Sequence, residues 1–401
     1  MKPNPNNTPA LSPQQVAAKL QAANMAARQQ VLSVAYPMLQ SIYSNSIDTT
    51  KQTQFQLPPQ NVGLIKGFLV KLQVTVTNPA AGSSTLSLTP MGPGNLLQNI
   101  VFTDLQNYQR INTSGWHMAM LNSLRQGRPF LSSTPSDSPF GFGSNWPVIK
   151  APATIAANSS GTIYMYYWIP LAYSENDLTG SIYANVVNAT MNLQMTLATA
   201  AQAVVANTAD PSLAIYQGAG AVAGVTLGNV SVTVYQSYLD QLPMSAQGPI
   251  LPSVDLNTMY EIKNTSFTGL TTGQDFYVPY SNFRHFLSTM VLLDNQTGGA
   301  YPSAGTDVNY FSLRAANATD LRKADPYTWA SFARRKLLTD TPVPLYLFDT
   351  REKPIYTTQQ GNMNIVANLS TVNAGCSLLT GWEMLANVSN LLNASSLASG
   401  G

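Results

Sequence analysis

The glycine-rich stretch IYQGAGAVAGVTLGNV, residues 215–230, is the first place where this chain could hold a ligand. Gly218, Gly220 and Gly224 follow a short apolar run, and Asp240 lies near the spacing of the acid that binds a ribose in dinucleotide sites. Such a site also needs a helix after the glycines, because the helix N-terminus holds the pyrophosphate. The chain continues instead with alternating β-branched residues. We therefore predict a loop that leads into a strand, and no cofactor.

Nucleophiles and metal ligands are scarce elsewhere in the chain. The sequence has two histidines, His117 and His285, on different predicted elements, and one cysteine, Cys376. Zinc sites and nucleophilic triads need several such side chains close together. We therefore predict that His117 makes a packing or polar contact. We also predict that Cys376, in the apolar run CSLLTGW, is a buried and unreactive thiol without a disulfide partner in its own chain.

Acidic residues offer two weaker candidates. Glu175 and Asp177 lie close together in YSENDLTG, and a carboxylate pair is what a glycosidase uses. The segment is typical of a turn, however, in which such side chains bind the local backbone. Asp294 begins a stretch that resembles a calcium loop, but Gly305 stands where the bidentate glutamate belongs. We predict no metal site here.

A run of cations lies on and beside a predicted helix in the second half of the chain. It is either a solvated helix face or a salt-bridged contact between subunits, and a site for an anionic ligand is the alternative. The aromatic residues nearby, Tyr327 and Trp329, have a helical spacing that suits packing better than the stacking of bases. The cations are Arg322, Lys323, Arg334, Arg335 and Lys336.

The low charge of the chain is its most informative bulk property. Only 9% of the 401 residues are charged, and the formal net charge is +2, whereas an ordinary soluble domain has about 25% charged residues. Few charges and a net charge near zero favour association, so we predict that neighbouring molecules cover much of the surface. The balance of acids and bases gives no basic footprint, so we predict no direct contact with nucleic acid.

The sequence shows no targeting segment. No stretch approaches the ~18 consecutive apolar residues of a membrane-spanning helix, and the start MKPNPNNTPA lacks the apolar core of a signal peptide. We therefore expect the protein to be made in the cytoplasm and to stay there until it assembles.

A helix is predicted near the N-terminus, with Ser12 as its N-cap, Pro13 in its first turn and Gln15 completing a capping box. Apolar residues then recur at steps of mostly three or four, while polar residues lie away from them. This stripe either packs on the protein's own core or lies on a membrane surface, and Pro37 is expected to kink or end the helix. The stripe consists of Val16, Leu20, Ala23, Ala27, Val31, Val34, Met38 and Leu39.

Beyond residue 50 the apolar period changes to two. Residues 68–76 and 191–197 alternate between apolar and polar side chains, which is typical of strands with one buried face. Further β-prone runs lie at residues 162–173, 285–294 and 343–349, separated by clusters of Gly, Pro, Asn and Ser. The pattern predicts an all-β, antiparallel sandwich body and not a βαβ fold.

Two short helices are predicted to interrupt the strands at corresponding places. The first, TSGWHMAMLNSLRQG, is capped by Thr113 or Ser114 and stops at Gly127. The second, DPYTWASFARRKLL, is opened by Asp325. Each is followed by a loop and then by a β-rich run. We therefore predict two sandwiches in tandem, each with a helix in the same loop, joined by the linker LPMSAQGPILPS.

Several phrases spread from about Arg28 to about Trp382 resemble the major capsid protein of tectiviruses, the icosahedral bacteriophages with an internal lipid membrane. They include SGWHMAMLNSLRQGRPFLSS, MYYWIPLAYSENDLTG, RKADPYTWASFARR and EKPIYTTQQGN. The resemblance implies a double jelly roll, which consists of two eight-stranded β-sandwiches side by side, each with a helix-bearing loop, after an N-terminal helix. Residues 1–50 would form an arm with the amphipathic helix, 51–245 the first jelly roll, 246–386 the second and 387–401 a C-terminal tail.

The resemblance also implies partners. Three copies would form a pseudo-hexagonal homotrimer, and these trimers would tile an icosahedral shell around the membrane and the genome. The helix from Ser12 to Tyr36 would face the membrane, with Lys19 and Arg28 available to anionic headgroups. Minor capsid, penton and tape-measure-like proteins would be further partners.

We therefore predict a structural major capsid protein of the virion, without catalysis and without cofactors. Two competing hypotheses remain. One is a jelly-roll spike that binds a receptor or a glycan. The other is a β-sandwich glycosidase, with Glu175 and Asp177 as its candidate carboxylates.

Overall fold

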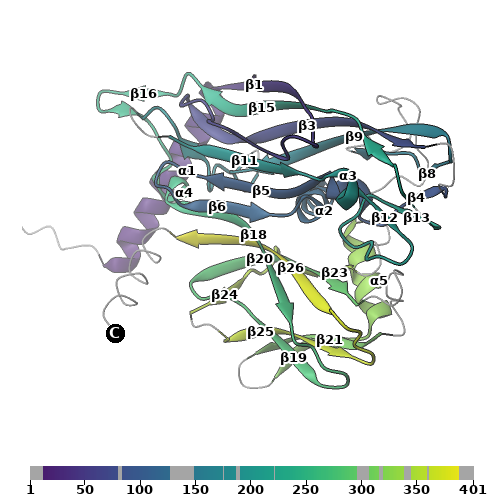
Figure 1. Cartoon of the computed structure of the whole chain (residues 1–401). Helices are drawn as coiled ribbons and strands as arrows, with labels where there is room; N and C mark the ends of the chain where they lie inside the picture. Colours follow the sequence, from purple (N-terminus) through teal and green to yellow (C-terminus); the bar gives the residue numbers. More distant parts are fainter. Residues whose placement is uncertain are drawn as a thin grey trace, which may run out of the picture.

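The chain forms two β-sandwiches that lie side by side, with the first above the second in Figure 1. Helix α1 (Pro13–Val34) extends from one end, helix α2 (Gly115–Gln126) lies between the sandwiches, and helix α5 (Pro326–Leu337) lies beside the second one. The structure is a computed structural model. It describes residues 12–79, 84–126, 149–174, 176–186, 190–220, 222–295, 307–315, 319–337, 345–358 and 361–387.

One sheet of the first sandwich has the strand order β1, β15, β3, β9, β7, and all neighbours are antiparallel. Along β3 and β9, buried residues alternate with partly exposed ones, because one face lies on the core and the other faces outwards. Two short strands, β10 (Ile182–Tyr183) and β14 (Thr226–Leu227), also pair with β3. The main strands are β1 (Tyr36–Ile47), β15 (Val230–Asp240), β3 (Leu64–Asn78), β9 (Ser159–Pro170) and β7 (Ile149–Lys150).

The facing sheet of the first sandwich continues into the second sandwich. Its strand order is β2, β11, β5, β6, β18, β26, β20, β23, and β24 also pairs with β20. The two halves meet where β6 and β18 run parallel, with Ile111 opposite Ile262 and Asn112 opposite Lys263. The strands of the first half are β2 (Gln54–Leu57), β11 (Asn192–Leu197), β5 (Leu97–Thr103) and β6 (Gln109–Thr113), and those of the second are β18 (Thr258–Thr268), β26 (Ser377–Asn387), β20 (Arg284–Asp294), β23 (Leu345–Asp349) and β24 (Ile355–Thr357).

The second sandwich is closed by a four-stranded sheet with the order β19, β25, β21, β22. Each sandwich therefore has two main sheets, and β1 and β22 are edge strands at opposite ends of this series. The strands of the closing sheet are β19 (Asp275–Pro279), β25 (Met363–Leu369), β21 (Val308–Ala315) and β22 (Asp320–Ala324).

Shorter elements complete the described chain. Strands β12, β13, β4 and β8 form a small sheet, and β16 and β17 form a hairpin between the two sandwiches in sequence. Their bounds are β12 (Val204–Ala206), β13 (Tyr216–Gly218), β4 (Leu86–Leu88), β8 (Thr154–Ile155), β16 (Met244–Ser245) and β17 (Gly248–Pro249), and the short helices are η1 (Gly92–Leu96), α3 (Ala200–Ala203) and α4 (Ser253–Leu256).

The caps of the helices are those expected from the sequence. Ser12 and Gln15 form a capping box at the start of α1. At the start of α5, the Asp325 carboxylate accepts hydrogen bonds from the backbone N–H groups of Tyr327 and Thr328. Helix α1 ends at Val34, before Pro37, so the predicted stop is confirmed.

The end of the predicted apolar stripe lies outside the helix. Met38 and Leu39 belong to β1, where they are exposed, and β1 pairs with β15 over residues 36–47. Part of the segment expected to form the N-terminal arm thus adds a strand to the first sandwich. The strands expected at residues 68–76, 191–197 and 285–294 lie within β3, close to β11, and within β20.

The middle of the glycine-rich stretch is a loop that leads towards β15, as predicted, but β13 and β14 occupy residues 216–218 and 226–227 of the stretch. Gly218 ends β13, Gly224 has the left-handed φ of 80°, and β15 begins at Val230. No helix follows the glycines in the described part of this stretch. A pyrophosphate site of the dinucleotide type therefore has no helix N-terminus here.

Each sandwich has its own apolar core, and the core of the first sandwich extends into the second. A large apolar cluster fills the first sandwich and a second cluster fills the other. The first cluster also includes residues of β18, β20 and β23, because the outer face of that sheet lies against the first sandwich. These residues are Tyr260, Ile262, Leu287, Met290, Leu292, Leu345 and Leu347.

Candidate interaction surfaces

Helix α1 is fastened to the body near its C-terminal end. The buried carboxylate of Asp255, on α4, accepts hydrogen bonds from Arg28 Nε at 2.6 Å and from Asn24 Nδ2 at 2.9 Å. Arg28 also lies 3.4 Å from Asp177. Val31 is fully buried in a small apolar cluster. These contacts fix the last turns of the helix on α4, which directly precedes β18, and on the first sandwich.

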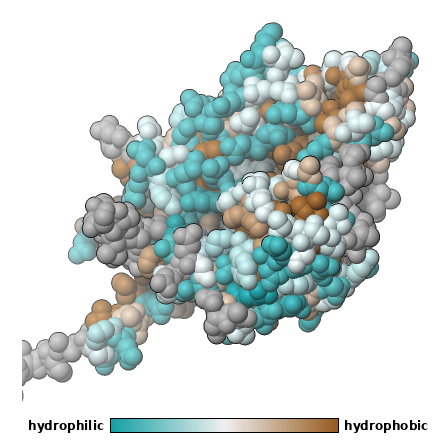
Figure 2. All heavy atoms as spheres, turned by 60° about the horizontal axis from the view of Figure 1, so that its bottom comes forward, coloured by the Kyte–Doolittle hydropathy of each residue, from teal (hydrophilic) through white to brown (hydrophobic). Residues whose placement is uncertain are grey.

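The first half of α1 has an apolar side that the rest of the described chain does not cover. Val16 and Leu20, one helical turn apart, are 51% and 53% exposed, and Met25, just past the middle of the helix, is 58% exposed. In Figure 2 this part of the helix stands away from the body at the lower left. The interpretation as a stripe that packs on the core therefore holds for its end, where Val31 is buried, and contact of its exposed start with a membrane stays a prediction. No helix in the described ranges has the length and hydropathy needed to cross a membrane.

The two cations predicted to face a membrane have different surroundings. Lys19 is exposed on the protruding half of α1. Arg28 is only 27% exposed, and its guanidinium forms an ion pair with Asp255. Sequence reasoning missed this pair because Asp255 follows Arg28 by 227 positions. Contact of either cation with a membrane stays a prediction.

The contact between the sandwiches is built around a buried ion pair. Arg125, at the end of α2, reaches Glu383 on β26. The Glu383 carboxylate also accepts hydrogen bonds from the hydroxyls of Tyr260 at 2.9 Å and Ser288 at 2.5 Å. Burial raises the cost of the negative charge, but Arg125 and the two hydroxyl donors hold the pKa of Glu383 below its ordinary value. The ion pair therefore ties α2 of the first sandwich to strand β26 of the second sandwich.

A second buried carboxylate lies at the same junction. Glu261, on β18, is fully buried and accepts hydrogen bonds from Arg284 Nε at 2.6 Å and from Lys263 Nζ at 3.3 Å. The hydroxyl of Tyr108, from the turn between β5 and β6, also donates to Glu261. Burial, together with Glu261, raises the pKa of Tyr108. This cluster holds the β5–β6 turn of the first sandwich against β18.

The fully buried His117 packs at this junction and has no catalytic surroundings. Its Nδ1 lies 2.7 Å from the hydroxyl of Thr113, and its ring packs on Gly381 of β26. A Cβ on Gly381 would lie 2.3 Å from the ring. Burial lowers the pKa of His117 to about 4, so the imidazole is neutral. The predicted packing and polar contact is confirmed.

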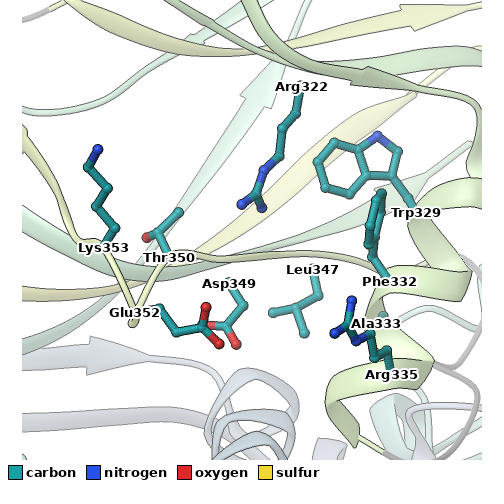
Figure 3. A pocket seen from close by; sticks show the side chains of 10 residues that line it. All are labelled: Arg322, Trp329, Phe332, Ala333, Arg335, Leu347, Asp349, Thr350, Glu352 and Lys353. Carbon is teal, nitrogen blue, oxygen red and sulfur yellow. The ribbon is translucent and has the colours of Figure 1, made fainter.

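A pocket of about 460 Å³ lies between α5, β22 and the residues at and after the end of β23. In Figure 3 the guanidinium of Arg322 points into its middle, Phe332 forms one wall, and Asp349 and Glu352 lie together on another. Cations of the predicted run thus face acids as well as an aromatic side chain. The carboxylates of Asp349 and Glu352 would repel a free anion, so the lining does not favour the anion site.

The remaining candidates show no chemistry in the described parts of the chain. Asp177 accepts hydrogen bonds from the backbone N–H of Thr179 at 3.0 Å and from its hydroxyl at 2.5 Å, as the turn predicts. Glu175 and Gly305 lie outside the described residues. Burial raises the pKa of the Cys376 thiol to about 11, so the thiol is protonated and unreactive. The described residues include no group of three His, Cys, Asp or Glu side chains that could hold a metal ion.

Solved structures share the architecture of this chain. The crystal structure of the STIV MCP has a TM-score of 0.62 at 11% identity, and the match covers 88% of this chain and 97% of that one. A chain from the atomic structure of Sulfolobus Turreted Icosahedral Virus has a TM-score of 0.61 at 13% identity, over 91% of this chain and 95% of that one. At such low identity, the likeness concerns the fold, which is the predicted double jelly roll.

Sequence comparison gives a closer relationship. The major capsid protein P3 of Enterobacteria phage PRD1 is 46% identical over 392 residues, which are 97% of this chain and 98% of the relative. Residues 5–242 match the family model for the N-terminal part of the P3 major capsid protein, and residues 257–399 match the model for its C-terminal part. Together these matches span nearly the whole chain. The chain therefore belongs to the P3 major capsid protein family.

Proposed function

We propose that this protein builds the shell of a virion as homotrimers of pseudo-hexagonal outline, which tile an icosahedral shell around an internal membrane and the genome. The observation that carries the proposal is the edge-to-edge junction of two sandwiches of the same topology, formed by β6 and β18. Each chain has two similar sandwiches, so three chains place six similar units around one axis. Six such units suit a hexagonal lattice. Members of the family are named as major capsid proteins, and a shell requires self-association.

The low charge of the chain supports this proposal. Trimer and lattice contacts larger than the ~1,200 Å² of a stable interface would cover surface that has few charges to keep it hydrated. The role is structural, and we propose no catalysis and no direct contact with nucleic acid. Minor capsid, penton and tape-measure-like proteins are proposed as partners at the edges of the lattice.

The protruding half of α1 is proposed to contact the internal membrane. It combines the exposed apolar side chains of Val16 and Leu20 with the exposed cation Lys19, a combination found in helices that lie at lipid surfaces. Arg28 contributes through its ion pair with Asp255, which holds the helix on the body. Additional contact of Arg28 with headgroups is part of the proposal.

The experiment that tests the trimer is a mass measurement of the purified full-length protein, by native mass spectrometry and by light scattering over a range of concentrations. We expect a trimer of the 43.1 kDa chain, with a three-fold particle of hexagonal outline in negative-stain images. A monomer at high concentration would contradict the proposal.

A further inference from the structure

A second pocket, of about 450 Å³, lies where the C-terminal half of α2 meets the outer sheet of the first sandwich. Its walls come from α2, from the first half of β3, and from the end of β9 with the residues that follow it. It is nearly as large as the pocket of Figure 3, which lies beside the other helix of this kind, α5. The two pockets differ in the charge of their walls.

The described lining of the pocket beside α2 has two cations and no acid. Lys66, on β3, is 9% exposed, and Arg125 lies in the last turn of α2. The pocket beside α5 has Asp349 and Glu352 in its wall. A third pocket, of about 170 Å³ beside the start of α2, has no charged residue in its described lining. Of these three pockets, the one between α2, β3 and β9 therefore has the charge that favours an anion.

Unpaired polar atoms lie in the same wall of this pocket. Asn122 is 2% exposed, and neither its Nδ2 nor its Oδ1 has a hydrogen-bond partner in the described structure. The buried Nε of Arg125 has none either. The two residues are three positions apart on α2, so they lie on the same face of the helix. A buried donor without a partner is costly, so a ligand that supplies an acceptor here is favoured.

The charges around the pocket suit a group with one negative charge. Glu383 already balances the charge of Arg125, so a group with two negative charges would be poorly matched. The ammonium of Lys66 has three N–H donors and can therefore bind an anion in addition to its contacts within the protein. A carboxylate has one charge and two acceptor oxygens, which the N–H groups of Lys66 and Asn122 can reach together.

The rest of the lining is largely apolar and aromatic. Leu69 and Trp168 point outwards from the neighbouring strands β3 and β9, and Tyr173 follows the end of β9. Such side chains pack on flat or apolar groups and make no demand for further charge. The pocket thus has a polar wall on α2 and β3 and an apolar wall formed by these three side chains.

We propose that this pocket binds a small organic monocarboxylate with a flat, apolar body. The carboxylate accepts hydrogen bonds from Lys66 and Asn122 near the guanidinium of Arg125, and the body packs on Leu69 and Trp168. The ligand would touch α2 and the outer sheet at once, so its binding would stabilise the first sandwich. The inference goes beyond the structural role in a shell and does not depend on the proposed trimer.

The proposal is tested with phenylacetate, and phenylacetamide is the uncharged control of nearly the same shape. Isothermal titration calorimetry of the full-length protein at neutral pH should give a dissociation constant of about 1 mM or lower for phenylacetate. Phenylacetamide should bind at least about tenfold more weakly, because hydrogen bonds to a charged group are the stronger ones. Equal binding of the two compounds, or no binding of phenylacetate at about 10 mM, would overturn the proposal.

Variants of Lys66 locate the site. Lys66→Met keeps most of the length of the side chain but removes its charge, and it should weaken phenylacetate binding by at least about tenfold. Lys66→Arg should keep most of the affinity. The matched control is Lys71→Met, on the same strand but outside the described lining, and it should bind phenylacetate as the wild type does. Circular dichroism checks that the variants keep the fold.

A variant of Asn122 adds a readout that a purely structural role would not give. Asn122→Leu replaces the unpaired amide by an apolar group of nearly the same size, so it should weaken phenylacetate binding several-fold without lowering the Tm. Wild-type affinity in both Lys66→Met and Asn122→Leu would refute a site in this pocket. The comparison of phenylacetate with phenylacetamide uses the wild-type protein, so it decides the proposal even if a variant does not fold.

Discussion

The sheet β18, β26, β20, β23 and the sheet β1, β15, β3, β9 occupy equivalent places in the two sandwiches, yet their surroundings differ. Strand β20 is buried over most of its length, because one face lies on the second core and the other on the first sandwich. Strand β3, its counterpart, alternates between buried and partly exposed residues. A strand buried on both faces is a run of apolar residues, whereas a strand with one open face alternates.

This difference shows how the chain divides its contacts between itself and its neighbours. The outer face of the second sheet is covered by a unit of the same chain, so its partner is always present at folding. The outer face of the first sheet has no such partner among the residues that the structure describes. Aromatic residues on this face are therefore only partly buried.

The largest expected effect comes from breaking the covered junction at its buried charge. Glu383→Ala would leave Arg125 buried without its carboxylate partner, and breaking a buried pair in this way typically costs about 3–5 kcal/mol. We expect that loss in the free energy of unfolding, measured by urea denaturation at fixed protein concentration. The control is Lys51→Gln, which removes an exposed pair with Asp48 and should cause no measurable loss. Equal effects of the two variants would show that the junction does not depend on this ion pair.

The next prediction compares the outer face of the sheet that contains β20 with the outer face of the sheet that contains β3. Leu292, on β20, is fully buried in the part of the first core that crosses the junction. Leu69, on β3, points outwards and is only partly buried. Leu292→Ala should cost about 2–5 kcal/mol of stability, as truncations in well-packed cores do. Leu69→Ala should cost the isolated chain less than about 1 kcal/mol, because little cavity forms. Similar losses would mean that the two faces are covered alike.

A smaller effect should follow from pH through His117. Burial lowers its pKa to about 4 in the folded chain, whereas an unfolded histidine has a pKa of about 6.5. Between these values the unfolded chain binds a proton that the folded chain does not. His117 therefore stabilises the fold fully above pH 6.5, and this contribution falls by about 1.4 kcal/mol per pH unit as the pH drops towards 4.

The measurement for this prediction is the slope of stability against pH between 6.5 and 5, above the range in which most carboxylates titrate. His117→Asn should make the slope shallower. His285→Asn, at an exposed position on β20, is the control and should change the slope less. An unchanged slope in His117→Asn would mean that the junction opens enough to admit a charged imidazole.

The local patterns of the sequence predicted the strands because each strand packs on its own core. The alternation of Phe68, Val70, Leu72 and Val74 directly reflects one buried face. The caps at Ser12 and Asp325 were equally local, since each binds backbone groups within three residues.

The contacts that join distant parts of the chain could not be predicted in the same way. Arg28 was assigned to the membrane because its partner Asp255 is remote in sequence. The pairing of Arg125 with Glu383 was also missed. One signal was available, because Glu383 is a single charge within the apolar run CSLLTGWEML, and a charge in such a setting requires a buried partner. The sequence does not say which cation that partner is.

The smallest expected effect concerns the open half of α1, which lies outside both sheets. Lys19→Glu should weaken binding of the full-length protein to vesicles that contain an anionic lipid by a few-fold to about tenfold, since each cation near such a surface contributes about 1 kcal/mol. Binding to uncharged vesicles and the free energy of unfolding should not change. The control is Lys51→Glu, which reverses an exposed cation on the body of the first sandwich.

A truncation can remove the part of α1 proposed to contact the membrane while it keeps the part that binds Asp255. Removing residues 1–22 takes away Val16, Lys19 and Leu20 but keeps Asn24 and Arg28, which hold the helix on Asp255. The truncated protein should therefore still form trimers while it co-sediments less with vesicles. If it bound vesicles as well as the full chain did, α1 would not be the membrane-facing element. If it lost the trimer, the open half of α1 would instead belong to the contact between copies, and the division between covered and uncovered surfaces would extend to this helix.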